Sequence, residues 1–317
     1  MRKAILSLVL AIVATVAVQA QQIAVVSAGG TTTIYKTLPE AVAGASAGST
    51  VYLPAGGFNL TDTLRITKKL TLVGVGYNIT GGNADGVTTI SGNIAFNKGS
   101  SGSVIMGVYM PSANNKGYIC IGKDGSAVED IVVKYCWVYR IEINNSQCID
   151  AVINQNYVSY INLGYSEATV TNNVIYFISY GDGAEIKYNV FCGSSSSPYY
   201  CRNCVISNNV ICGSVYESGS SQFRDNIGSG SNSYYESIGT SKWADVFVNY
   251  GSSPDPRYDY HFKEAYQQYE GKVGIYAGSG FNDSGMPPVP YISYKYIPDH
   301  TDADGNLNIK IRVKASE

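Results

Sequence analysis

An asparagine that recurs at short, nearly regular intervals constrains the fold of this chain more than any other feature. It stands at Asn209 in the stretch CVISNNVICG. The same local pattern places Cys136, Asn156, Asn173, Asn189 and Asn226 in one column with it, at successive spacings of 20, 17, 16, 20 and 17 residues. Asparagine is a poor strand former, yet both flanks of each copy have the aliphatic residues of strands. Six aligned copies indicate a repeat rather than a single turn.

The positions around this column also keep their character from copy to copy. Three positions before it the residues are apolar: Val133, Ile153, Val170, Ile186, Ile206 and Phe223. Two positions after it they are apolar except the last: Val138, Val158, Ile175, Phe191, Ile211 and Gly228. Two positions before it they are polar: Lys134, Asn154, Thr171, Lys187, Ser207 and Arg224. Each copy therefore has an inward residue, two outward or corner residues, the column residue and another inward residue.

A period near 18 residues is too short for a helical-hairpin repeat and is typical of a β-solenoid, in which stacked coils bury a common core. Strands of stacked coils lie about 4.8 Å apart, so the column becomes a ladder of amides that both donate and accept hydrogen bonds. Asparagine also tolerates the left-handed backbone of a sharp corner. We expect a structural role, turning the corner and tying coil to coil, for Asn156, Asn173, Asn189, Asn209 and Asn226.

With its flanking aliphatic columns, this ladder resembles the right-handed parallel β-helix of the pectate-lyase-like superfamily. The stretch TLPEAVAGASAGSTVYLPAGGFNLTDTLRITKKLTLVGVG is similar to the usual opening of such proteins. The resemblance implies an amphipathic capping helix at Leu38–Ala45, and strands at Val51–Leu53, Leu64–Ile66 and Leu70–Val73. It covers about 34–276 and implies an all-β chain, a right-handed parallel β-helix over 21–285. It implies no single activity, because the superfamily holds lyases, hydrolases, adhesins and inert scaffolds.

The C-terminal part divides into two predicted pieces. The stretch Asp259–Gly278 resembles the closing coil of secreted bacterial β-helix proteins without an assigned reaction. Alternation at Tyr291–Ile297 and Leu307–Val313 then predicts a hairpin within an extension over 286–317. Between its strands, Asp302–Asn306 is similar to the start of a calcium loop, but Val313 stands where the bidentate acid is expected. We interpret this stretch as a turn.

The N-terminal residues have the pattern of a signal peptide over 1–20. Arg2 and Lys3 precede a short apolar run, Ile5–Val18, and Val18-Gln19-Ala20 supplies a small-x-small cleavage signal. The run is short for a membrane anchor of roughly 20 residues, the alternative interpretation. We expect a mature, secreted chain from Gln21, periplasmic, at the cell surface or extracellular, with no membrane span. Losing Arg2 and Lys3 leaves 20 of the 22 basic residues against 24 acidic ones, and no basic cluster indicates nucleic acid.

Seven cysteines are an odd number for an exported chain. Cys201-Arg-Asn-Cys204 has CxxC spacing, but neither a helix N-terminus nor a second ligand pair favours a redox or zinc site. Cys192 and Cys212 share an offset in adjacent copies, within reach of a disulfide, although in-register parallel strands aim the sulfurs unfavourably. We expect buried cysteines that act as small hydrophobes, and no metal site.

A strip of outward residues follows the repeat and is the predicted ligand surface. Ile141, Ile161 and Ile178 should point inward. The outward residues beside them are then Arg140, Tyr160 and Phe177 in one row, and Glu142, Asn162 and Ser179 in the next. Aromatic and hydrogen-bonding groups together suit sugar rings and their hydroxyls. The alternative is an ordinary sheet face that is solvated or covered by a loop.

Catalytic candidates are few. They are Arg140 and Glu142 on the strip, with Asp182 and Glu185 in connecting loops that would have to fold back toward it. A hydrolase needs paired carboxylates, and a lyase needs a calcium-binding acid cluster beside a Lys or Arg. Neither pattern is evident, so we expect no cofactor, and calcium only if the chain is a lyase. His261 and His300 lie outside the repeats without a nucleophile, and the loop tyrosines of PYY (Pro198–Tyr200) either contact glycan or pack on the wall.

The sequence therefore favours a secreted, non-catalytic protein that binds a polysaccharide or cell-surface glycan, or serves as a surface scaffold. A polysaccharide lyase or glycoside hydrolase acting along the same strip is the alternative. A structural spacer or adhesin that contacts protein is the third hypothesis. Exposed aromatics on one face favour the binder, acids gathered on one face favour the enzyme, and a spacer requires neither.

Overall fold

The computed structural model describes residues 22–78, 86–112, 116–195, 197–216, 219–230, 232–296, 298, 300–301 and 304–314. The predicted signal peptide over 1–20 lies outside the described residues, as does Asp302 of the predicted turn.

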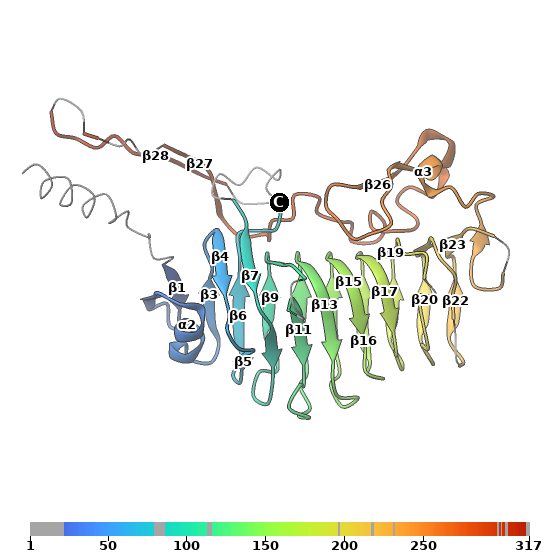
Figure 1. Cartoon of the computed structure of the whole chain (residues 1–317), viewed down its shortest axis with the longest axis horizontal. Coiled ribbons are helices and arrows are strands. Elements are labelled where there is room, and N and C mark those ends of the chain that lie inside the picture. Colours follow the sequence, from blue (N-terminus) through green and yellow to red (C-terminus); the bar gives the residue numbers. More distant parts are fainter. Residues whose placement is uncertain are drawn as a thin grey trace, which may run out of the picture.

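Most strands of the described residues belong to two large sheets, and nearly all neighbours within each sheet are parallel (Figure 1). The first sheet contains β1 (Ile23–Val26), β2 (Thr32–Tyr35), β3 (Ser49–Tyr52), β6 (Leu70–Val73), β9 (Val104–Met106), β12 (Val132–Lys134), β14 (Ala151–Asn154), β16 (Ala168–Thr171), β18 (Glu185–Lys187), β20 (Val205–Ser207) and β22 (Gln222–Arg224). The second contains β4 (Gly56–Asn59), β5 (Leu64–Ile66), β7 (Thr88–Ser91), β8 (Ile94–Phe96), β10 (Tyr109–Met110), β11 (Tyr118–Ile121), β13 (Trp137–Ile143), β15 (Tyr157–Asn162), β17 (Val174–Ser179), β19 (Val190–Phe191), β21 (Val210–Ile211), β23 (Ile227–Gly228) and β24 (Glu236–Ser237). This arrangement is consistent with a parallel β-helix.

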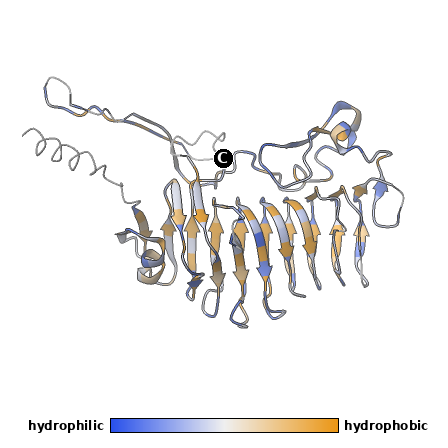
Figure 2. Cartoon of the chain, viewed as in Figure 1, coloured by the Kyte–Doolittle hydropathy of each residue, from blue (hydrophilic) through white to orange (hydrophobic). Residues whose placement is uncertain are grey.

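From β12 onward the chain visits the two sheets in turn, and each strand pairs in register with its counterpart one repeat later. The two predicted inward columns are buried between the sheets, apart from the half-buried Phe223 at the end. Hydrophobic residues accordingly dominate these strands (Figure 2). Each fully buried Val or Ile side chain contributes roughly 1.5–3 kcal/mol, so the stacked columns are the main source of stability.

The asparagine column forms a continuous ladder of hydrogen bonds. The Nδ2 of each asparagine donates to the Oδ1 of the next, at 2.9 Å from Asn156 to Asn173, 3.0 Å from Asn173 to Asn189, 3.0 Å from Asn189 to Asn209 and 2.9 Å from Asn209 to Asn226. Each Nδ2 also donates to a backbone carbonyl of the preceding repeat, as Asn173 does to Ile153 at 2.9 Å. The buried side-chain amides of the ladder therefore have hydrogen-bond partners along the stack, as the repeat predicted.

The left-handed corner is not made by the ladder asparagine itself, and our expectation on this point was wrong. Positive φ values belong to the residue before it: Tyr135 (53°), Gln155 (55°), Asn172 (53°), Tyr188 (57°), Asn208 (56°) and Asp225 (53°). The reason is geometric. The chain reverses at this outward residue, which leaves the next side chain pointing inward beneath the corner, where it can meet its neighbours.

A short helix, α2 (Leu38–Gly44), closes the N-terminal end of the core, within one residue of the predicted capping helix. Pro39 stands in its first turn, and the Oγ1 of Thr37 accepts a hydrogen bond from the backbone N–H of Glu40 at 3.3 Å. Leu38 and Val42 are buried in the core. The helix therefore covers apolar side chains that a bare first repeat would expose.

The predicted closing coil at Asp259–Gly278 is wrong. Strand β26 (Asp259–Phe262) pairs antiparallel with β25 (Phe247–Asn249), outside both large sheets and close to the helical turns α3 (Trp243–Val246) and η2 (Glu264–Tyr269). Residues 273–287, the C-terminal strap, then run back along the wall of the repeats (Figure 1). Val273 and Ile275, which lie within the predicted coil, are instead buried against the outer face of the second sheet.

The left-handed corner residues hold this strap. The Nδ2 of Asn172 donates to the carbonyls of Ile275 and Ala277 at 2.8 and 2.7 Å, and the Oε1 of Gln155 accepts from the N–H of Asn282 at 2.8 Å. The corner therefore serves both the ladder inside and the strap outside.

The terminal hairpin is present as predicted. Strands β27 (Tyr291–Tyr296) and β28 (Lys310–Lys314) pair antiparallel and project from the body (Figure 1). The start of the predicted extension still packs on the repeats. Met286 and Pro287 precede the hairpin and are buried against the first repeats of the chain. Among the described residues, no helix is both long enough and apolar enough to cross a membrane.

Candidate functional site

The predicted outward strip lies in register on the second sheet. Arg140 pairs with Tyr160 and Tyr160 with Phe177, while the row between them, Ile141 to Ile178, is buried. The polar row pairs in the same way, from Glu142 to Asn162 to Ser179.

The two charged members of the strip form an ion pair, although the Nε of Arg140 is buried without a hydrogen-bond partner. An Nη2 of Arg140 lies 3.3 Å from an Oε1 of Glu142, and the guanidinium lies 5.6 Å from the ring centroid of Tyr118. The Oδ1 of Asn162 accepts from the N–H of Gly164 at 2.9 Å and caps a loop. Ser179 is 4 % exposed. The side chains of the polar row are therefore bonded or buried within the protein, which leaves few groups free to bind a ligand.

The four catalytic candidates do not form one cluster. Arg140 and Glu142 lie on β13 of the second sheet. The prediction of Glu185 in a connecting loop was wrong, because Glu185 begins β18 of the first sheet, where it pairs with Lys187. Asp182 lies in the loop between β17 and β18, and its partners are Arg202 and Asn203.

The aromatic part of the strip is far larger than the sequence predicted. Ring centroids 4.5–6.3 Å apart link ten side chains in one connected set, which we call the aromatic band. Its members are Tyr118, Tyr139, Tyr160, Tyr165, Tyr176, Phe177, Tyr180, Tyr199, Tyr200 and Tyr216. Tyr165 and Tyr216 are the most exposed, at 43 % and 47 %, and the others are half-buried. The band crosses successive repeats and offers an elongated surface.

Three tyrosines of the band have left-handed backbones. Tyr165, Tyr180 and Tyr200 have φ values of 60°, 59° and 49°. Glycine or asparagine adopts this conformation more easily, and a bulky residue there costs on the order of 1–2 kcal/mol. The N–H of Tyr165 donates to the carbonyl of Tyr180, at 2.6 Å, so the strained corners stack on one another. Such strain tends to gather at functional sites.

A polar groove of about 720 Å³ adjoins this end of the band. Its lining includes Tyr165 together with Ser146, Glu167, Asp182, Arg202 and Asn203. The guanidinium of Arg202 lies 5.0 Å from the ring centroid of Tyr165. The groove and the band therefore form one continuous candidate site.

Asp182 is the best-anchored side chain of the groove. Its Oδ1 accepts from the Nδ2 of Asn203 at 2.8 Å, and its Oδ2 accepts from the Nε of Arg202 at 3.0 Å. The amide of Asn203, followed by the Arg202 guanidinium, holds the pKa of Asp182 below its usual range. The carboxylate stays ionised, so it suits accepting hydrogen bonds from hydroxyls better than donating a proton.

A second polar groove, of about 530 Å³, lies where the strap crosses the corners, and Gln155, Asn282 and Asp283 line it. Burial raises the pKa of Asp283, whose Oδ1 accepts from the hydroxyl of Tyr276 at 2.8 Å. It is the one carboxyl group lining this groove, whereas glycoside hydrolysis uses two.

His261 has partners that the sequence did not reveal. Its Nδ1 lies 3.0 Å from Glu270 Oε1, and its ring stacks on Tyr276 at a centroid distance of 3.7 Å. Neither partner is an activated nucleophile. Among the described residues, no group of three or more His, Cys, Asp or Glu side chains is placed to hold a metal ion.

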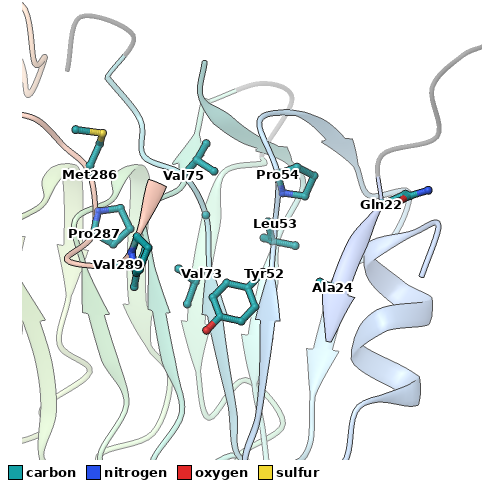
Figure 3. Close-up of a pocket in the computed structure, with 12 residues that line it drawn as sticks. Gln22, Ala24, Tyr52, Leu53, Pro54, Val73, Val75, Met286, Pro287 and Val289 are labelled. Atoms are coloured by element: carbon teal, nitrogen blue, oxygen red, sulfur yellow. The ribbon is translucent and has the colours of Figure 1, made fainter. Parts of the chain in front are cut away.

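An apolar groove of about 200 Å³ lies between the first repeats and the end of the strap (Figure 3). Tyr52, Leu53 and Val73 face Met286 and Pro287 across it. It has few polar groups to orient a sugar, so it is a weaker candidate than the polar groove.

All seven cysteines are unbonded and buried, as expected of small hydrophobes. Cys192 and Cys212 do not form a disulfide.

The sequence identified Tyr160 and Phe177 because they share an offset, and it missed most of the band. Tyr139 and Tyr176 stand three positions after the ladder column, which is a usable signal. Tyr165, Tyr180 and Tyr200 lie in loops of unequal length, where the repeat gives no register.

Comparison of the chain with protein-family models, curated proteins and solved structures finds no match.

Proposed function

We propose that this chain is an exported right-handed parallel β-helix, of the kind found in the pectate-lyase-like superfamily, that binds a neutral polysaccharide without cleaving it. The observation that carries the proposal is the aromatic band and its continuity with the polar groove around Asp182. Export is inferred from the signal-peptide pattern of residues 1–20.

The chemistry of the band supports an extended glycan. Aromatic rings present apolar faces with a polar tip at each tyrosine, which suits the C–H faces of sugar rings and their hydroxyls. Rings distributed over several repeats favour a polymer over a monosaccharide, because each bound sugar unit adds contacts. The Asp182 carboxylate supplies a fixed acceptor at one end.

Charge favours a neutral polymer over an acidic one. Arg140 is paired with Glu142 and Arg202 with Asp182, so neither guanidinium is available as a full positive charge. Glu167 adds a further carboxylate to the groove lining. A polyuronate would meet net negative charge there.

One observation favours the alternative of a polysaccharide lyase or glycoside hydrolase: two acids, Glu167 and Asp182, line the groove beside Arg202. A general acid requires a raised pKa, whereas the pKa of Asp182 is lowered. A lyase base should be an unpaired Lys or Arg, whereas Arg202 is ion-paired. Binding therefore accounts better for the groove, and calcium enters only under the lyase alternative.

The test is a panel of neutral and acidic polysaccharides, incubated with the full chain with and without calcium. Retention on a neutral polymer whose length stays constant is the expected result. Shortening of any polymer would establish an enzyme and overturn the non-catalytic proposal. Absence of both effects across the panel would favour a scaffold or an adhesin that contacts protein.

A further inference from the structure

The C-terminal hairpin leaves the outer edge of its second strand open. Strand β28 pairs with β27 on its inner side, and among the described residues no other strand pairs with it. All five of its residues are exposed, with Ile311 at 57 % and Val313 at 60 %. The unpaired edge of a strand has backbone N–H and C=O groups that can pair with another strand, and a hairpin of two strands is only marginally stable in water. The outer edge of β28 is therefore a candidate docking surface.

The stretch before β28 lengthens this edge. Residues 306–309 belong to no strand and are all exposed, as are Asp304 and Gly305 before them. Since β28 ends at Lys314, the exposed stretch runs from Asp304 to Lys314, and we call it the C-terminal edge. It projects from the body with the rest of the hairpin (Figure 1), so another molecule can reach it.

The C-terminal edge alternates between polar and aliphatic residues. Its even-numbered positions are polar: Asp304, Asn306, Asn308, Lys310, Arg312 and Lys314. Its odd-numbered positions after Gly305 are aliphatic: Leu307, Ile309, Ile311 and Val313. Successive residues of a strand point to opposite faces, so Ile311 and Val313 lie on one face of β28 and Arg312 lies on the other. The acid stands at the start of the edge and the basic residues stand at its end.

This order of charges makes the edge complementary to itself in the antiparallel direction. Two copies aligned about Asn308 place Asp304 opposite Arg312 and Leu307 opposite Ile309. Residues that face each other in an antiparallel pair share a face, so charge meets opposite charge and aliphatic meets aliphatic. A parallel, in-register alignment would instead place Arg312 opposite Arg312. The edge therefore fits a second copy of this chain in one direction only.

The inner edge of β28 is already occupied. There Tyr294 lies opposite Arg312, whose guanidinium is 5.8 Å from the tyrosine ring centroid, and Tyr296 lies opposite Lys310. A second copy can therefore add only at the outer edge. The result would be a sheet of four strands, in which the two β28 strands are central and the two β27 strands are outermost.

We propose that two copies of this chain associate by antiparallel pairing of their C-terminal edges about Asn308. The pairing is two-fold symmetric, so the contact between Asp304 and Arg312 occurs twice. Gly305 has φ of 80° in the single chain, and glycine can change to an extended conformation at little cost when the second strand pairs. One pair of edge strands is a small interface, so the dimer should dissociate on dilution.

The first test needs no polysaccharide. Sedimentation equilibrium of the mature chain expected from Gln21 should show a monomer that converts to a dimer as the concentration rises. A monomer at every concentration up to about 1 mM would overturn the proposal.

Two charge variants test the alignment. Asp304→Arg places arginine opposite arginine at both symmetric contacts, and Arg312→Asp places aspartate opposite aspartate. Each variant alone should raise the dissociation constant of the dimer about tenfold or more. An equimolar mixture of the two should restore association, because each variant then meets the opposite charge at both contacts. Lys36→Asp, which reverses an exposed charge outside the hairpin, should dimerise like the wild-type chain.

Restored association in the mixture cannot arise from misfolded variants, so it reports the pairing itself. Single variants that dimerise as well as the wild-type chain would overturn the alignment about Asn308. A mixture that associates no better than its components would overturn it too.

A consequence for binding rests on the proposed function. A dimer carries two aromatic bands, so a polymer with many sites can be bound by both copies, which strengthens retention without any new contact in the site. Retention of Arg312→Asp on a neutral polysaccharide should therefore be weaker than that of the wild-type chain and should recover in the mixture with Asp304→Arg. A confirmed dimer with equal retention would overturn this consequence but not the pairing. No retention by any of the proteins would count against the proposed function and leave the pairing to sedimentation.

Discussion

A single buried amide illustrates how the ladder works at the scale of the residue. Each ladder asparagine accepts and donates side-chain hydrogen bonds along the stack. Its Nδ2 also donates to a backbone carbonyl of the preceding repeat, as Asn173 does to Ile153. Removing one amide therefore leaves buried partners in two repeats, so the loss exceeds that of one surface hydrogen bond.

We expect Asn173→Leu to lower the free energy of unfolding by about 2–4 kcal/mol, because buried groups of Asn156, Asn189 and Ile153 each lose one hydrogen bond. Thermal or denaturant unfolding measures the change, with the exposed Asn59→Leu as the matched control. Equal stability of the two variants would mean that the ladder contributes little.

Asp283 gives a prediction for pH. Its pKa is raised in the folded chain by partial desolvation, so its ionised form costs stability at neutral pH, and the cost is small because Asp283 is also exposed to solvent. Asp283→Asn keeps an acceptor for the Tyr276 hydroxyl and should raise the free energy of unfolding at pH 7. The gain should shrink as the pH falls and vanish below the ordinary value of 3.8, where the wild-type carboxyl is neutral in both states.

Unfolding measured at several pH values tests this, with the exposed Asp62→Asn as the control. A gain that grows on acidification would instead mean that the ionised form of Asp283 stabilises the fold.

At the scale of the residue, the sequence predicts the buried columns of the repeats better than the corner and loop residues on their surface. The ladder and the inward columns follow from offsets that every repeat shares. The left-handed residue was misplaced by one position, because both asparagines of the NN pair at Asn172–Asn173 tolerate that conformation. The tyrosines at Tyr165 and Tyr180 break the usual preference for small residues, so no propensity predicts them.

The strap is the element that most changes the expected architecture. Its residues cover outward side chains of the second sheet, including Val174, Val190 and Val210, that the repeat alone would leave exposed. Residues 273–277 form bends and turns, with Gly274 at φ 74°, and their sequence does not say whether the apolar side chains face the core or the outer wall. Long-range contacts with residues such as Asn172 decide this, and no local pattern encodes them.

Replacing Asn172 tests how the strap is held. Asn172→Gly keeps the left-handed backbone but removes the donors to Ile275 and Ala277, so hydrogen exchange of 273–287 should accelerate. Asn172→Ala should do the same and lose about 1 kcal/mol more, because alanine is strained at positive φ. Unchanged exchange in both variants would show that the strap does not depend on the corner.

At the scale of the whole molecule, the candidate site belongs to no single repeat. The band takes rings from strands and loops between Tyr118 and Tyr216, and the groove takes Asp182 from one repeat and Arg202 from the next. Stacking in register aligns these groups, so the ladder and the site depend on the same geometry. The sequence could predict the face that carries the site, but not the loop residues that complete it.

The most direct test of this account is affinity electrophoresis on a retained neutral polysaccharide, comparing the wild-type chain with Tyr165→Ala. Tyr165 joins the band to the groove through Tyr180 and Arg202. Its loss should weaken retention about tenfold, the effect of truncating a central aromatic contact. Tyr52→Ala removes an equally exposed ring at the apolar groove and should change nothing. Equal retention of all three proteins, or a loss confined to Tyr52→Ala, would contradict the assignment of the binding surface to the aromatic band.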